Sequence, residues 1–173
     1  SEVASLPGIN IDEKDIVSST GALSFKNVPK KLAVIGGGYI GLEMGSVWSR
    51  LGSDVTVIEY LDYITPGMDK EISNEFQKIL TKQGIKFKMG SKVESLNSNG
   101  NFVTIKYKNV KDSKEELIEV DKVLVSVGRK PYTEGLNLTK VGVKKDKKGR
   151  IEVNEKLQTS VNNIYAIGDV IKG

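Results

Sequence analysis

Two hydrophobic periods alternate along the first part of the chain, and they predict its first elements. Residues 31–35 form an almost continuous apolar run, which is typical of a strand buried on both faces. Residues 54–59 read as a second strand. Between the two strands, apolar residues recur at helical spacing and a glycine is placed to end the helix. These residues are Ile40, Met44, Val47, Trp48 and Leu51, followed by Gly52.

The pattern then predicts a second helix and a change to antiparallel structure. The helix presents Ile72, Phe76, Ile79 and Leu80 on one face, with Asp69 near its start and Gly84 after its end. A third strand follows at residues 85–89. Residues 102–107 and 117–120 are short alternating runs, and Asn99-Gly100 is a hairpin turn signal. Residues 123–127 return as an apolar strand ending in Gly128.

These elements predict an α/β fold: a Rossmann-like parallel sheet with helices, carrying an antiparallel β-meander insert that lies on the sheet. Residues 1–28 lack sustained periodicity and read as connecting structure with one short helix. Arg129-Lys130-Pro131 reads as a boundary, and the last forty residues are short strands and turns. We therefore divide the chain into residues 1–28, 29–130 and 131–173.

Composition excludes several kinds of chemistry. The chain has 0 Cys and 0 His, so it offers no thiolate nucleophile, no disulfide and no imidazole base. No metal site is expected. Any reaction must use a bound cofactor, carboxylates, or parts of a protein outside this sequence. Because the chain does not begin with Met and carries no leader pattern, we expect a mature or excised segment.

The charge balance does not point to nucleic acid or membrane. Lys and Arg number 26 against 22 Asp and Glu, a formal net charge of +4. The one dense basic run, residues 140–150, contains no aromatic residue on which a base could stack. We interpret it as a solvated turn, so a nucleic-acid-binding role rests on the basic balance alone. The longest apolar runs are too short to span a bilayer.

The strongest chemical signal is the glycine pattern at residues 36–41, Gly-Gly-Gly-Tyr-Ile-Gly. It matches G-x-G-x-x-G between a predicted strand and a predicted helix, the context in which this pattern binds a dinucleotide. Gly36 can make the tight turn, Gly38 can let a pyrophosphate approach the backbone, and Gly41 can let helix and strand pack closely. The helix N-terminus then offers free N–H groups to the phosphates.

Glu59 at the end of the second strand favours NAD over NADP. A carboxylate there accepts hydrogen bonds from the adenosine ribose hydroxyls and repels a 2′-phosphate. No Arg occurs between Arg50 and Arg129 to bind such a phosphate.

The residues that carry a family likeness are spread over almost the whole chain. Residues 36–59 resemble the NAD-binding domain of the dihydrolipoamide dehydrogenase family, which belongs to the flavin-dependent pyridine nucleotide–disulfide oxidoreductases. Residues 83–88, 127–131 and 149–154 add to the likeness, and residues 163–170 resemble the second FAD motif of the family. The resemblance makes residues 29–130 the NAD-binding domain. It makes residues 1–28 a segment leaving the FAD-binding region, and residues 131–173 one returning to it.

The resemblance also implies roles for individual residues. NAD would be held by the loop and first helical turns, by Glu59, by Val93 at the adenine and by Gly128 on the nicotinamide side. Asp169 would hydrogen-bond the ribityl chain of FAD. The loop residues implied are Gly36, Gly37, Gly38, Tyr39, Ile40, Gly41, Leu42 and Glu43.

In the intact enzyme of this family, electrons pass from dihydrolipoamide to a redox disulfide, to FAD and then to NAD. The first FAD-binding loop, the Cys pair and a His-Glu base are absent from this sequence, so we predict no catalytic residue here and no turnover by the chain alone. The resemblance implies as partners the remaining FAD and interface domains, a second subunit, and 2-oxo acid dehydrogenase complexes that present lipoyl domains. It implies the mitochondrial matrix, with a plastid or the bacterial cytoplasm as alternatives.

Two alternatives stay open. Tyr39 departs from the small aliphatic residue usual in this family and resembles glutathione reductase, so another flavoprotein disulfide reductase, of the glutathione or mercuric reductase type, is possible. The chain could also be a stand-alone NAD-binding module without turnover. An excised domain should expose apolar surface around residues 1–28 and 131–173, whereas a self-contained module should not.

Overall fold

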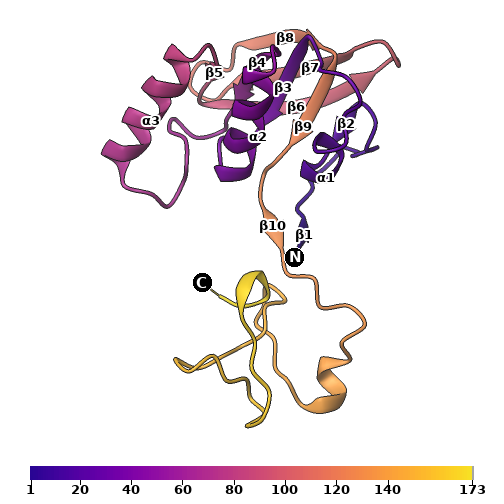
Figure 1. The fold of residues 1–173 in the computed structure, drawn as a ribbon, viewed down its shortest axis with the longest axis vertical. Coiled ribbons are helices and arrows are strands. Elements are labelled where there is room, and N and C mark those ends of the chain that lie inside the picture. Colours follow the sequence, from indigo (N-terminus) through magenta and orange to yellow (C-terminus); the bar gives the residue numbers. More distant parts are fainter. Residues whose placement is uncertain (173) are drawn as a thin grey trace. The chain divides into compact units, whose positions relative to one another are not determined.

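The computed structural model describes residues 1–172, which form two compact units (Figure 1). The larger unit comprises residues 5–127, and the smaller combines residues 1–4 with the chain from residue 128 onward. Residues 5–28, which the sequence analysis sets apart, therefore fold within the larger unit.

The larger unit contains three helices and eight strands within the described residues. Both long helices lie where the apolar spacing predicts them. In chain order the elements are β2 (Ile16–Val17), α1 (Ser19–Ala22), β3 (Lys31–Ile35), α2 (Tyr39–Arg50), β4 (Asp54–Ile58), α3 (Lys70–Lys82), β5 (Lys86–Lys88), β6 (Ser91–Ser98), β7 (Val103–Asn109), β8 (Glu115–Val120) and β9 (Lys122–Val125).

A five-stranded parallel sheet in the order β2-β9-β3-β4-β5 forms the centre of this unit. Figure 1 shows β9, drawn in orange, beside β3 from the early part of the chain. The α/β fold class with a parallel sheet is thus confirmed. β2 is an edge strand. It lies in a segment that the sequence predicts as connecting structure, because two apolar residues are too few to show a period.

Each face of the sheet buries its own apolar cluster, because alternate residues of a strand point to opposite faces. Along β3, Leu32 and Val34 face the helices, whereas Ala33 and Ile35 face the meander. The helix-side cluster includes Ala22, Leu42, Trp48 and Leu80, so all three helices cover one face. The meander-side cluster includes Val103, Ile105, Tyr107 and Val120. The unit is therefore a three-layer structure of helices, sheet and meander.

The meander is a three-stranded antiparallel sheet in the order β6-β7-β8, and the predicted turn at Asn99-Gly100 joins its first two strands. Strand β6 is not predicted from the sequence. A bulge lies between Val93 and Ser95, and Val93 and Leu96, three positions apart, pack against the same cluster. The alternating pattern that announces a strand is lost where an extra residue enters it.

Helix α3 meets the core through a different face from the predicted one. Leu80 is buried as expected, but Ser73 is its other buried residue. Ile72, Phe76 and Ile79 are exposed. The helix begins after Asp69, whose carboxylate accepts the N–H groups of Glu71 and Ile72.

The smaller unit is built from short elements, as the sequence predicts for the last forty residues. Its buried apolar residues are Val143 and Ile151. Among residues 1–172, no helix has the length and apolar character needed to cross a membrane, and no group of three acidic, His or Cys side chains could hold a metal ion. The elements are β1 (Glu2–Val3), β10 (Arg129–Lys130), η1 (Leu138–Val141) and η2 (Gly168–Val170).

Candidate functional site

The glycine loop leaves the carboxyl end of β3, where the sheet changes its direction of winding. From β3 the chain proceeds outward through β4 to β5, and then returns to the opposite side of β3 as β9. Ligands of open α/β sheets bind in the crevice at such a switch point. Gly36 follows β3 and Ser126 follows β9, so both lie at this position.

Gly36 can only be glycine where it stands. Its φ is +105°, and a Cβ there would lie 2.5 Å from the carbonyl oxygen of Ser126. The Ser126 hydroxyl donates to the carbonyl of Ile35 at 3.0 Å, with a longer contact of 3.3 Å to that of Gly36. The Gly36 N–H donates to the Ile58 carbonyl at 3.0 Å. The first glycine of the loop is thereby fixed between β4 and β9.

The Gly37 peptide is held from both sides. Its N–H donates to Glu59 Oε2 at 2.6 Å, and its carbonyl accepts the N–H of Thr65 at 2.8 Å. A Cβ at Gly37 would come within 3.2 Å of Ile64 and 3.3 Å of Glu59. The loop that follows β4 therefore clamps the glycine loop in one conformation.

Gly38, in contrast, faces open space. It is the N-cap of α2 without a side-chain cap, and a Cβ placed on it would meet no atom within 4 Å. The first N–H groups of a helix have no intrahelical partner, and they present a partial positive charge. The backbone at Gly38 and at the start of α2 is thus the part of the loop that an anion can approach.

Gly41 lets α2 pack against the sheet. A Cβ there would lie well inside contact distance of the Gly36 carbonyl, 2.5 Å from Ser126 Oγ and 3.0 Å from Val34 Cγ1. No side chain could replace its hydrogen without moving the helix away from the loop. The position of the helix N-terminus therefore depends on this glycine.

Glu59 combines an acid with a nearly buried position. It directly follows β4 and is 8% exposed. Its Oε1 accepts the N–H of Leu61 at 2.8 Å, while Oε2 accepts that of Gly37. Each carboxylate oxygen has a second acceptor position, so the group can still accept hydroxyl donors. The same carboxylate can hold the loop and receive a diol.

The remaining predicted residues fall into two groups. Near the loop, Tyr39 and Glu43 are exposed, Ile40 is half-buried and Leu42 is buried. Val93 lies in the same unit at the bulge of β6, a strand whose first residue, Ser91, donates its N–H to the Glu59 carbonyl at 2.8 Å.

Gly128 and Asp169 belong to the smaller unit. Gly128 has φ +127°. The exposed Asp169 carboxylate accepts a hydrogen bond from the Ser1 hydroxyl and lies 3.6 Å from Arg129 Nε. The hydrogen bond from Ser1 lowers the pKa of Asp169, and the Arg129 charge acts in the same direction.

Three residues of this region escape the sequence analysis: Ile64, Thr65 and Ser126. Thr65 is almost fully buried with φ +50°, and its hydroxyl lies 2.8 Å from Ser73 Oγ. The signals for these residues are faint in the sequence. Thr65 stands before Pro66-Gly67, a turn pattern, and Ser126 ends an apolar strand beside the glycine loop.

Taken together, the arrangement can bind a phosphate-bearing ligand at the start of α2 and a hydroxyl-bearing group at Glu59. The chain contributes no thiol or imidazole to it.

The chain is similar to known proteins over its whole length. A family model described as pyridine nucleotide-disulphide oxidoreductase matches residues 1–173. The chain is 57% identical to a mitochondrial dihydrolipoyl dehydrogenase of Pisum sativum, covering all of this chain and 34% of that protein. It is 55% identical to the corresponding mitochondrial enzyme of Caenorhabditis elegans, covering all of this chain and 35% of that protein. The chain thus spans about a third of the length of these relatives.

The fold is also similar to that of a solved flavoprotein disulfide reductase. A copper(II) complex of RclA, an HOCl-induced flavoprotein disulfide reductase of Escherichia coli, superposes with a TM-score of 0.85 at 31% identity. The match covers 99% of this chain and 38% of that one.

Proposed function

Because the chain belongs to the pyridine nucleotide-disulphide oxidoreductase family, as the resemblance of its motifs implied, we propose that it is the NAD-binding segment of a flavin-dependent dihydrolipoyl dehydrogenase. The observation that carries the proposal is the contrast within the loop. Gly37 is clamped by the protein, while Gly38 and the start of α2 are left open to a ligand. The pyrophosphate of NAD would bind there.

Glu59 would select NAD over NADP. Its carboxylate would accept the ribose hydroxyls, and its charge would repel a 2′-phosphate. Residues 36–43 would orient the pyrophosphate and the nicotinamide, Val93 would contact the adenine and Gly128 would lie on the nicotinamide side. Asp169 would hold the ribityl chain of FAD. When bound, NAD supplies the hydride acceptor and FAD relays electrons from the dithiol.

The rest of such an enzyme would have to supply the redox disulfide and the acid-base residues. Partners of the complete protein would be a second subunit and the lipoyl domains of 2-oxo acid dehydrogenase complexes. The mitochondrial matrix would be its compartment, since the relatives from Pisum sativum and Caenorhabditis elegans are mitochondrial enzymes.

Calorimetric titration of the purified 173-residue chain with NADH and, separately, with NADPH tests the proposal. We expect binding of NADH and little response to NADPH. Gly38→Ala should weaken NADH binding by at least about tenfold, equivalent to about 1.4 kcal/mol, because its methyl group fills the approach to the backbone. Its thermal melting should stay close to that of the wild type, since the methyl group meets no protein atom.

Gly45→Ala is the matched control. Gly45 lies on the same helix, on the face packed against Val34 and Val55, so its substitution should leave NADH binding intact. A folded wild-type chain that binds neither nucleotide would contradict the proposal.

One observation favours the alternative that the parent enzyme is another flavoprotein disulfide reductase, of the glutathione reductase type. Tyr39 is more than half exposed at the start of α2, in the position where the resemblance to glutathione reductase places a ring that covers the flavin. Preference for NADPH over NADH in the same titration would favour this class.

A further inference from the structure

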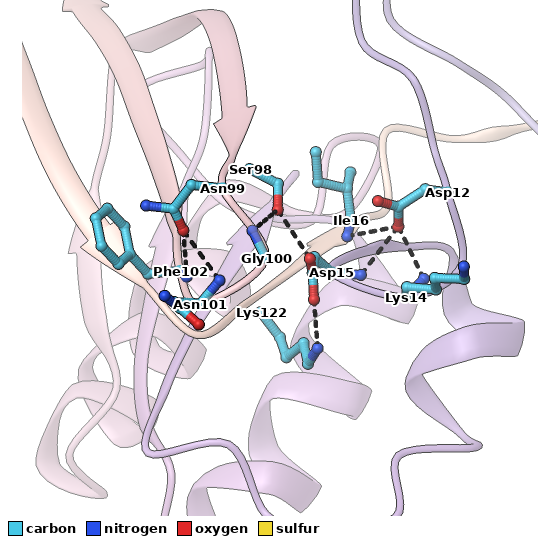
Figure 2. A network of polar contacts seen from close by, with 10 residues as sticks. All are labelled: Asp12, Lys14, Asp15, Ile16, Ser98, Asn99, Gly100, Asn101, Phe102 and Lys122. Atoms are coloured by element: carbon cyan, nitrogen blue, oxygen red, sulfur yellow. Dashed lines mark hydrogen bonds and ion pairs between the residues drawn. The ribbon is translucent and has the colours of Figure 1, made fainter.

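The turn that joins β6 to β7 contains a network of hydrogen bonds that takes no part in the proposed nucleotide site. Figure 2 shows it around Asn99. The side-chain oxygen Oδ1 of Asn99 accepts the N–H groups of Asn101 at 2.9 Å and of Phe102 at 3.0 Å. Two backbone donors on one amide oxygen polarise the carbonyl carbon Cγ and would stabilise a negative charge on that oxygen.

The next residue, Gly100, has its backbone N–H directed at a hydroxyl. That N–H donates to Ser98 Oγ at 3.2 Å, and the Ser98 hydroxyl donates in turn to Asp15 Oδ2 at 2.8 Å. Figure 2 shows the Ser98 hydroxyl between the Gly100 nitrogen and Asp15. Because its proton is directed at the carboxylate, its oxygen lone pairs are free to accept the Gly100 N–H. The three groups form a chain along which a proton can leave the amide nitrogen.

Asp15 is fixed in place by its own segment. Its other carboxylate oxygen accepts Lys122 Nζ at 2.6 Å. The neighbouring Asp12 accepts the N–H groups of Lys14, Asp15 and Ile16, which holds the loop before β2 in one shape. The arrangement thus joins the β2 loop, the β6–β7 turn and the start of β9, segments that lie far apart in the sequence.

From these contacts we propose that Asn99 is a self-modifying site, which loses its side-chain amide as ammonia through attack by the Gly100 backbone nitrogen. The nitrogen forms a bond to Asn99 Cγ while its proton passes to Ser98 and the Ser98 proton to Asp15. The charge on Oδ1 is held by the N–H groups of Asn101 and Phe102. The new bond closes a five-membered ring. The proton that reached Asp15 is then passed through water to the side-chain nitrogen Nδ2 of Asn99, and the bond between Cγ and Nδ2 breaks as Oδ1 becomes a carbonyl again. Ammonia leaves, and the ring that remains is a succinimide.

Water then opens the ring at either of its two carbonyls. One product is aspartate at position 99, and the other is isoaspartate, in which the backbone continues through the side-chain carbon. The net change is the exchange of the amide NH₂ for OH, with water consumed and ammonia released.

Glycine at position 100 makes the attack accessible. It has φ +85°, and the space that a Cβ would take is open. Because glycine has no side chain, residue 100 does not crowd its own nitrogen. Either product adds a carboxylate to the turn, and isoaspartate also lengthens its backbone. The change would act on the turn that sets the Ser98–Val103 register of β6 and β7.

Asn109 is a matched internal control. Its Oδ1 also accepts the N–H of the residue two positions on, Lys111, at 2.8 Å. The next residue, however, is Val110, whose branched side chain crowds the nitrogen. The Val110 N–H is already bound to the Gly90 carbonyl at 2.7 Å. The proposal therefore predicts conversion at Asn99 and none at Asn109.

The test is to incubate the purified folded chain in mildly alkaline buffer and map its peptides by mass spectrometry, with enzymatic labelling of isoaspartate. We expect ammonia loss and isoaspartate at Asn99, with Asn109 unchanged. Ser98→Ala should slow the conversion several-fold in the folded chain but not in urea, where the relay to Asp15 does not exist. Asp15→Asn should slow it in the same way.

Two results would overturn the proposal. One is a folded chain whose Asn99 stays intact while the urea-unfolded chain converts, because the fold would then protect the residue. The other is an equal rate for wild type and both variants in folded chains whose circular dichroism matches. Neither readout involves a nucleotide, so the outcome does not depend on the proposed NAD site.

Discussion

At the scale of single residues, Thr65 beside the glycine loop is held in a conformation that its residue type rarely adopts. It is a β-branched residue in the left-handed region, which costs roughly 1–2 kcal/mol relative to the right-handed region. Its backbone N–H holds the Gly37 carbonyl, and its hydroxyl is paired with Ser73 Oγ in a buried position. Strain of this kind persists where the surroundings determine the conformation. Here those surroundings are the pair with Ser73 and the clamp on Gly37.

A double-mutant cycle on Thr65 and Ser73 measures this pairing. Thr65→Val or Ser73→Ala alone leaves one buried hydroxyl without its partner, and each should cost about 1–3 kcal/mol of unfolding free energy. The double variant should cost clearly less than the sum of the two, because no hydroxyl is then left unpaired. Urea unfolding followed by circular dichroism provides the measurement, with Thr65→Ser as the control that keeps the hydroxyl. Additive losses would show that the two hydroxyls do not interact.

At this scale a residue near the site can be predicted from the sequence only where its spacing from a strand or a helix indicates its place. The place of the glycines at 36, 38 and 41 between β3 and the first turn of α2 could be predicted, because each is defined by its distance from a strand and a helix. Thr65 and Ser126 could not, since they meet the loop through space after long excursions of the chain. The positive φ of Thr65 also leaves no trace in its residue type, because threonine rarely adopts it.

At the scale of elements, helix α2 carries two glycines with different steric surroundings. Gly41→Ala should destabilise the protein by about 1–3 kcal/mol, because its methyl group would overlap Gly36, Ser126 and Val34. Gly45→Ala should be neutral or stabilising by up to about 1 kcal/mol, since its Cβ would make ordinary contacts at 3.4 and 3.5 Å and alanine favours the helix. Chemical denaturation of both variants tests the contrast. Equal losses would mean that α2 can shift to accept either methyl group.

The elements themselves were predictable to the extent that their periods were regular. The βαβ unit and both long helices follow from apolar spacing. β6 could not be recognised because its bulge interrupts the alternation at Val93. The buried face of α3 was predicted wrongly except at Leu80, since Ile72, Phe76 and Ile79 are exposed. Its other buried residue is the polar Ser73, which is paired with Thr65 by a hydrogen bond that no hydrophobic pattern records.

The contact between the β2 loop and the meander should be sensitive to acid. The hydrogen bond from Lys122 lowers the pKa of Asp15, and that from Ser98 acts in the same direction. A group whose pKa is lower in the folded state stabilises the fold above its unfolded pKa, near 3.8, and loses that contribution as the pH falls through the folded value. Melting temperatures of wild type and Asp15→Asn between pH 7 and about pH 3 should therefore converge on acidification. A constant difference would contradict the assignment.

At the scale of the whole molecule, the two units differ in how much apolar surface they bury. The larger unit contains two buried clusters, whereas Val143 and Ile151 are the buried apolar residues among residues 128–172. Large apolar side chains are exposed in the ranges expected to meet other domains, for example Leu23 and Ile167. Large apolar side chains are also exposed on α2 and α3. The exposure of apolar side chains therefore does not distinguish residues 1–28 and 131–173 from the rest of the surface.

Hydrogen exchange should separate the two units. Amides of β3, β4 and β9 should exchange most slowly, because they lie in the buried parallel sheet. Amides of η1 and η2 should exchange close to the unprotected rate, since these short elements contain no buried residue. Peptide-resolved deuterium uptake of the purified chain measures both. Equal protection across the two units would show that the smaller unit shares the stability of the larger.

The position of β9 in the parallel sheet has a consequence for the order of folding. β9 lies between β2 and β3, yet it is made last: Ala33 pairs with Val123, 123 − 33 = 90 residues later. Contacts of such long range slow folding, because the loop must close before they form. During synthesis β2 and β3 would leave the ribosome long before the strand that joins them. The sheet is therefore completed from within, after both of its edge strands, β2 and β5, have been made.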